Sequence, residues 1–152
     1  MIRKIVFAAM LALAPAAQAQ TGIDQRVIGE FTPTRDMTSA ALGATAAFWA
    51  ALDRGDLSLS YGLTAPALRD AVTLQEFTDA VAPTADFGVP RRVMRLTWHH
   101  EQPNYPGTAL AVDWQVRDGD TLLGGGYLIW QLLDDGTFGL LRLDTTDLRD
   151  AQ

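Results

Sequence analysis

The chain has 152 residues, no cysteine, and 18 acidic against 12 basic residues, which gives a formal net charge of −6. The absence of cysteine excludes disulfides, thiol nucleophiles and thiolate metal sites. The acidic excess, with no cluster of basic residues, argues against nucleic acid or an anionic membrane surface as a partner.

The first nineteen residues have the features of a secretory signal peptide. Arg3 and Lys4 precede an apolar run at residues 5–13, and a small-x-small cleavage signal ends at Ala19, ahead of Gln20. This nine-residue run is far shorter than the ~20 residues that cross a bilayer as a helix, so we expect a cleaved leader and no stable membrane anchor. The expected location of the product is the periplasm or the medium.

Without this leader the chain keeps 133 residues, and the loss of two basic residues lowers their number from 12 to 10 against 18 acidic residues, so the net charge becomes −8. This length fits one domain with its own core. Residues 20–37 have no clear period and contain Gly22, Gly29 and Pro33, which predicts an extended lead-in. The single domain is expected over residues 38–148.

The first predicted helix begins at Thr38 or Ser39, either of which can cap a helix. Its apolar face, with helical spacing, consists of Ala41, Leu42, Thr45, Phe48, Trp49 and Leu52. Gly55 follows the last apolar position, where a glycine commonly ends a helix, and Asp56 is placed to cap a short second helix. We expect Asp53 to face water, and we interpret the two acids as part of a turn, not as a catalytic pair.

Two further short helices are predicted. Thr64 as cap and Pro66 in the first turn begin one of them. Thr73 and Glu76 form a capping box that begins the other, which stops before Pro83. The residues expected to face inward from this last helix are Leu74, Phe77, Ala80 and Val81.

From residue 93 onward the hydrophobic period changes to two, which predicts half-buried strands at 93–98 and 110–116. Residues 122–133 are apolar on both faces, as in a central strand, and a last strand is expected over 138–143. Together the pattern predicts an α+β fold in which N-terminal helices pack on one face of a curved, antiparallel, four-stranded sheet.

Several runs resemble the NTF2-like cone fold: ALDRGDL at the end of the first helix, SYGL, FGVPRRV before an apolar strand, and the YPG turn. The layout over roughly residues 40–143 is similar to a family of small secreted bacterial proteins known as domain of unknown function 4019. The resemblance implies a cone formed by helices and sheet and a tendency to form homodimers. It supplies no catalytic residues.

Most motif-based chemistries are not supported. His99 and His100 are adjacent, so on a strand they face opposite ways and cannot share a metal ion. The glycines at 124–126 lack the Lys-Ser/Thr and the helix of a phosphate loop, and we interpret them as a bulge or a place where another backbone comes close. We therefore expect no cofactor and no metal.

One set of polar residues could support catalysis. Asp113 lies in mid-strand among apolar neighbours, and His99 shares a polar strand face with Arg95 and Thr97. The resemblance implies an alternative function, a proton-transfer enzyme of the isomerase or dehydratase type that uses Asp113 and His99 within the cone. The same alternation is typical of any half-solvated antiparallel sheet.

The hypothesis that we favour is a binding module without chemistry. A cone closed by a curved sheet can leave a pocket, in which Tyr61, Trp98 and Trp114 would bind an unknown small ligand. A periplasmic protein partner is the other possibility, and the open edge of the sheet could pair two copies into a dimer.

Overall fold

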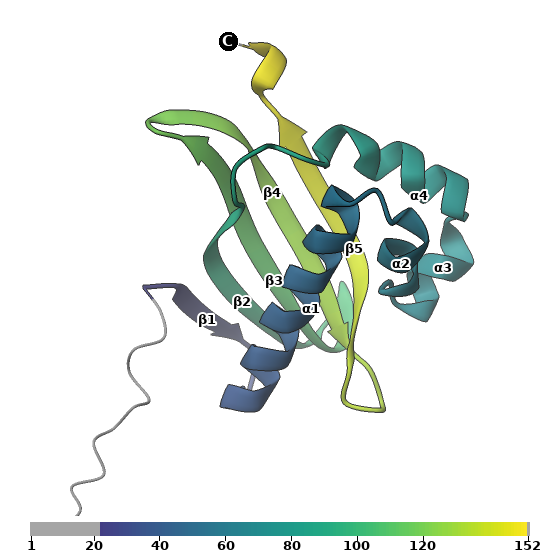
Figure 1. The fold of residues 1–152 in the computed structure, drawn as a ribbon. Coiled ribbons are helices and arrows are strands. Elements are labelled where there is room, and N and C mark those ends of the chain that lie inside the picture. The colour runs from purple at the N-terminus through teal and green to yellow at the C-terminus, as the bar shows by residue number, and fades with distance from the viewer. Residues whose placement is uncertain (1–21, 152) are drawn as a thin grey trace, which may run out of the picture.

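The structure is a computed structural model that describes residues 22–151 (Figure 1). The expected signal peptide, residues 1–19, and its cleavage site between Ala19 and Gln20 lie outside the described residues. The chain has an α+β fold in which helices cover one face of a curved, mostly antiparallel sheet, as the sequence predicts. Of the helices that are described, none combines the length and the apolar character needed to span a membrane.

Within residues 22–151 the sheet has five strands in the order β1-β2-β3-β4-β5. The predicted antiparallel meander consists of β2 (Arg92–Gln102), β3 (Tyr105–Asp118), β4 (Thr121–Leu132) and β5 (Phe138–Asp147). The additional strand, β1 (Asp24–Ile28), pairs in parallel with β2 and lies in the predicted lead-in. All five of its residues are exposed, so no alternation of apolar and polar residues marks it in the sequence.

The long helix α1 (Arg35–Asp53) crosses the face of the sheet. It begins before the predicted Thr38 or Ser39 because the Thr34 hydroxyl accepts a hydrogen bond from the Met37 N–H at 3.1 Å. The predicted apolar face is confirmed, since Phe48 and Leu52 are buried against the sheet.

The three short helices are α2 (Leu57–Gly62), α3 (Pro66–Ala71) and α4 (Leu74–Val81). The predicted turn before α2 is confirmed: Gly55 has φ +72°, and the Asp56 carboxylate accepts from the Leu59 N–H at 3.1 Å. The capping box of α4 is also present. Two details differ, because Ala65 and not Thr64 is the cap of α3, and Leu74 is 42% exposed.

The core lies between α1 and the inner face of the sheet, which we define as the face that α1 covers. Its largest side chains include Trp98, Trp114 and Trp130, whose indole nitrogens are buried without a hydrogen-bond partner. Each ring instead meets another aromatic ring at a steep angle, for example 87° between Phe48 and Trp130 and 67° between Trp49 and Trp114. A gap of about 10 Å³ remains beside Trp114, roughly the space of one water molecule.

Gly124, Gly125 and Gly126 let β4 bend between its two neighbours. A Cβ atom at Gly126 would lie 2.0 Å from the Asp144 carbonyl oxygen, and one at Gly125 would lie 2.9 Å from that of Trp114. This confirms that the glycines mark a place of close backbone approach.

Candidate functional site

The predicted residues Asp113 and His99 lie on the outer face of the sheet, which we define as the face opposite α1. Strand pairing arranges this face in three rows across β2 to β5: Arg95, Asp113, Tyr127 and Asp144; Thr97, Ala111, Ile129 and Arg142; His99, Ala109 and Gln131. The helices of Figure 1 all lie against the other face or the β5 edge, so most of the outer face is open.

The middle of the outer face is apolar. Ala109, Ala111 and Ile129 are buried there although no helix covers them. They are covered by larger neighbours on the same face, namely Tyr105, Tyr127 and Leu141. The outer face therefore carries a small hydrophobic cluster of its own.

A shallow hollow of about 220 Å³, the central hollow, opens over this cluster. Its lining residues are Arg95, Thr97, His99, Tyr105, Ala111, Asp113, Tyr127 and Ile129. Asp113 and His99 therefore both line the central hollow, as expected for residues of neighbouring strands that lie on the same face of the sheet. The hollow lies outside the space between helix and sheet, where the enzyme hypothesis would place them.

Within the central hollow, Asp113 and His99 have different partners. The Arg95 guanidinium donates through Nε to one Asp113 oxygen at 2.7 Å, and its Nη2 lies 2.7 Å from the same oxygen in an ion pair. The His99 ring lies 4.9 Å from the Tyr105 ring, and burial lowers the pKa of the imidazole, which favours its neutral form. In the strand register His99 is opposite Ala109, four residues from Asp113, a separation of roughly 13 Å along the strand. The two side chains do not form a hydrogen-bonded acid–base pair.

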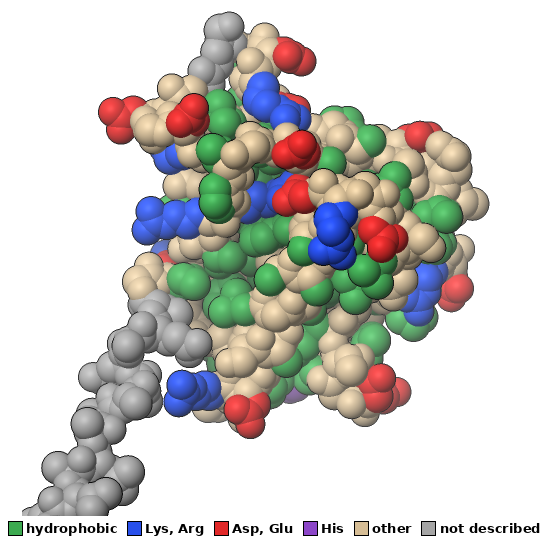
Figure 2. Space-filling model, in the orientation of Figure 1, with side chains coloured by type: hydrophobic (Ala, Val, Ile, Leu, Met, Phe, Trp, Pro, Cys, Tyr) green, Lys and Arg blue, Asp and Glu red, His purple; other side chains and the backbone are tan. Residues whose placement is uncertain are grey.

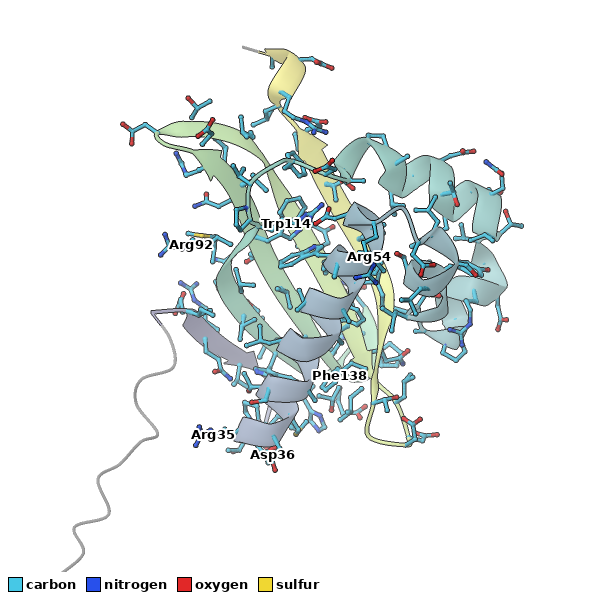
Figure 3. The ribbon with its side chains drawn as sticks, in the orientation of Figure 1. Arg35, Asp36, Arg54, Arg92, Trp114 and Phe138 are labelled. Carbon is cyan, nitrogen blue, oxygen red and sulfur yellow. The ribbon has the colours of Figure 1, made fainter. Side chains whose placement is uncertain are left out.

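The three residues predicted to bind a ligand do not surround an open pocket. Trp98 is 0% and Trp114 3% exposed, and both belong to the core. In Figure 3 Trp114 points into the space between the sheet and α1. The Tyr61 hydroxyl donates to the Val72 carbonyl at 2.7 Å and so joins α2 to the end of α3. The space around these residues is filled by packed side chains.

Asp53, expected to face water, is exposed and also binds Arg91, 38 positions along the chain. Its two oxygens accept from Arg91 at 2.8 and 2.9 Å, and one also accepts from the Asp86 N–H at 3.0 Å. Burial raises the pKa of Asp53, but the hydrogen bonds and the charge of Arg91 outweigh it, so the pKa of this carboxyl lies below its ordinary value. The expectation that Asp53 faces water is confirmed, since the residue is exposed. Its pairing with Arg91 was not predicted, because no local pattern connects residues so far apart in the sequence.

The Arg91 side chain is only 4% exposed. Its guanidinium also donates to the Thr84 carbonyl at 2.7 Å and lies 5.4 to 5.9 Å from the centres of the Trp49, Phe87 and Trp114 rings. Arg91 therefore fixes the beginning of β2 to the end of α1.

His99 and His100 face opposite sides of β2, as predicted. His100 stacks on Phe31 with 5.1 Å between the rings, and its Nδ1 lies 2.9 Å from the Thr108 hydroxyl. Among residues 22–151, no group of three or more His, Cys, Asp or Glu side chains is arranged to hold a metal ion.

No protein-family model matches the chain, and no curated protein matches it.

Proposed function

We propose that this chain is an exported, non-catalytic domain of the NTF2-like cone type that binds a protein partner through the outer face of its sheet. Support for export comes from the leader-like pattern of residues 1–19. Support for the cone comes from helices packed on one face of a curved antiparallel meander.

The observation that carries the proposal is the difference between the two faces of the sheet. Between the inner face and α1, the gap beside Trp114 in the described part of the chain has about 10 Å³, too small for a ligand larger than water. The outer face has the central hollow of about 220 Å³, with an apolar floor and a rim of Tyr, Arg and His side chains. Tyrosine and arginine are enriched among the residues that contribute most to protein–protein binding.

The chemistry of the central hollow indicates what the partner presents to it. Ala111 and Ile129 supply the floor, and Tyr105 and Tyr127 supply aromatic walls. Asp113 is paired with Arg95, so the two charges largely offset each other within the central hollow. An apolar or aromatic side chain of the partner, inserted between the two tyrosines, fits this lining best.

The alternative, a proton-transfer enzyme that uses Asp113 and His99, has less support. Both residues line the central hollow, but Asp113 binds Arg95 and lies roughly 13 Å from His99 along the strand. The hollow is also shallow, whereas proton transfer beside a carbonyl benefits from a site that excludes water.

The proposal is tested by native mass spectrometry on the protein isolated from the periplasm of its own host. We expect a complex with a protein partner, which the substitution Thr97→Arg should abolish because the new side chain fills the central hollow. The matched control is Thr78→Arg on α4, a residue of similar partial burial that should leave the complex intact.

Tyr127→Ala is a second variant, which removes one wall of the hollow without adding a charge. Circular dichroism should show that all three variants are folded. A complex that survives both Thr97→Arg and Tyr127→Ala would contradict the proposal, as would a small bound molecule in place of a partner. A homodimer lost in both variants would identify the partner as a second copy.

A further inference from the structure

A larger hollow lies beside the beginning of β2 and the end of β3, and residues from both sides of the sheet line it. Its volume is about 690 Å³, and we call it the arginine groove. Its lining residues are Arg91, Arg92, Gln115, Arg117 and Gly119, together with Ile23, Pro90 and Val93. The volume lies within the ~300–1,000 Å³ range of small-molecule sites.

The arginine groove is positively charged in a chain that is otherwise acidic. Arg92 is directly opposite Gln115 in the strand register, and Arg117 follows two residues later on the same face. Both arginines are exposed, and no Asp or Glu lines the groove. Arg117 uses one nitrogen to donate to the Asp120 carbonyl at 3.0 Å, while Arg92 has no hydrogen bond or ion pair with the described part of the chain.

The other eight arginines of residues 22–151 are divided evenly between those with and those without an ion pair. Four of them form ion pairs with an aspartate: Arg26, Arg91, Arg95 and Arg149. Of the three arginines that line the arginine groove, Arg91 is paired with Asp53, whereas Arg92 and Arg117 have no ion pair with an acidic side chain of residues 22–151. They therefore keep donors available for an anion.

The backbone beside the groove is held in place from the other face of the sheet. Arg91 is buried, and Asp53 and the Thr84 carbonyl fix its side chain. Because successive side chains of a strand alternate, this contact directs the next residue, Arg92, away from α1, as Figure 3 shows. A guanidinium on a fixed backbone loses less conformational entropy when it binds a ligand.

We propose that the arginine groove binds a small molecule that carries a carboxylate and an apolar portion. Arg92 and Arg117 would bind the carboxylate, since guanidinium groups donate paired hydrogen bonds to carboxylates, and the Gln115 amide can add a third donor. Ile23, Pro90 and Val93 line the groove beside these groups and would contact the apolar portion. This site is separate from the central hollow and does not depend on the proposed protein partner.

Isothermal titration calorimetry with octanoate tests the proposal, with octanamide as the neutral probe of the same shape. We expect saturable 1:1 binding of octanoate, and binding of octanamide weaker by about tenfold or more because charge-assisted hydrogen bonds are lost. The double variant Arg92→Gln/Arg117→Gln should bind octanoate about tenfold or more weakly than the unchanged protein does. Its affinity for octanamide should change by no more than a small factor.

The matched control is Arg35→Gln/Arg54→Gln, which removes the same charge from two exposed arginines at the ends of α1, far from Arg92 in Figure 3. It should bind octanoate as the unchanged protein does. The proposal is overturned if octanoate does not saturate, if both double variants lose affinity equally, or if octanamide and octanoate bind alike. Competition by inorganic phosphate at equal affinity would overturn the requirement for an apolar portion.

Discussion

At the scale of single residues, Arg91 connects parts of the fold that lie far apart in the sequence. No local sequence pattern indicates these contacts. Arg91 joins Asp53 at the end of α1 to the Thr84 carbonyl, and its guanidinium lies against three aromatic rings. A buried guanidinium is stabilising only while its hydrogen bonds are made, because its desolvation is costly. The geometry around Arg91 meets this condition.

We expect Arg91→Ala to lower the free energy of unfolding by about 2–4 kcal/mol, since it removes the ion pair and leaves a cavity between the rings. Equilibrium unfolding in urea measures this change. Arg35→Ala, at an exposed position in the first turn of α1, is the control and should change stability by less than about 0.5 kcal/mol. Equal effects of the two substitutions would show that the Arg91 contacts contribute nothing.

The lowered pKa of Asp53 gives this ion pair a defined pH dependence. A carboxyl with a depressed pKa in the folded state stabilises the protein above its unfolded pKa, ~3.9, and loses this contribution as the pH falls through the folded value. The destabilisation caused by Asp53→Asn should therefore be largest near neutral pH and shrink below about pH 4. Urea unfolding at both pH values measures it, and an effect independent of pH would contradict the assignment.

At the scale of elements, the glycines of β4 are required by the neighbouring backbones. Gly126→Ala would place a Cβ atom 2.0 Å from the Asp144 carbonyl oxygen, so β4 and β5 must move apart. We expect a loss of more than about 2 kcal/mol in thermal or urea unfolding. Gly43→Ala, in α1 where nothing lies within 4 Å of the added atom, should instead stabilise the protein by about 0.5–1 kcal/mol. A tolerated Gly126→Ala would mean that the strands adapt.

Elements specified by nearby residues could be predicted from the sequence. Asp56 and the Thr73–Glu76 capping box act within a single helical turn, and both are present as predicted. Elements specified by distant contacts could not. β1 forms because it pairs with β2 some 70 positions later, and Ala65 caps α3 while its N–H donates to the Leu140 carbonyl at 2.7 Å.

At the scale of the whole molecule, the period-two pattern predicts which residues share a face but not what each face does. Trp98 and Trp114 alternate with Thr97 and Asp113, so the large apolar side chains turn toward α1 and the polar ones away from it. The interpretation of the tryptophans as pocket residues did not anticipate that they fill the inner space themselves. The arginine groove escaped notice because its lining comes from three separate segments.

The two faces also differ in their surroundings. On the helix-bearing face, hydrophobic side chains show between α1 and the strands, with both acidic and basic side chains distributed around them (Figure 2). The outer face carries four strand arginines: Arg92 and Arg95 on β2, Arg117 on β3 and Arg142 on β5. The protein is therefore acidic overall but presents its strand arginines on one side.

Stability should be uneven across the sheet. β1 is paired along one edge only and all its residues are exposed, whereas β3 and β4 are paired on both sides and contribute to the core. We expect the amides of β1 to exchange with deuterium well before those of β3, because local opening of β1 exposes little apolar surface. Hydrogen exchange followed by mass spectrometry measures this, and equal protection of the two strands would contradict it.

The unpaired indole nitrogens have a spectroscopic consequence. Three of the four tryptophans have indole nitrogens buried away from bulk water, which could otherwise reorient around an excited indole ring. Native fluorescence should therefore be blue-shifted and resist aqueous quenchers, and unfolding should shift it strongly to the red. Neither the central hollow nor the arginine groove is lined by tryptophan, so this intrinsic signal reports on the inner side of the sheet and is insensitive to what binds outside.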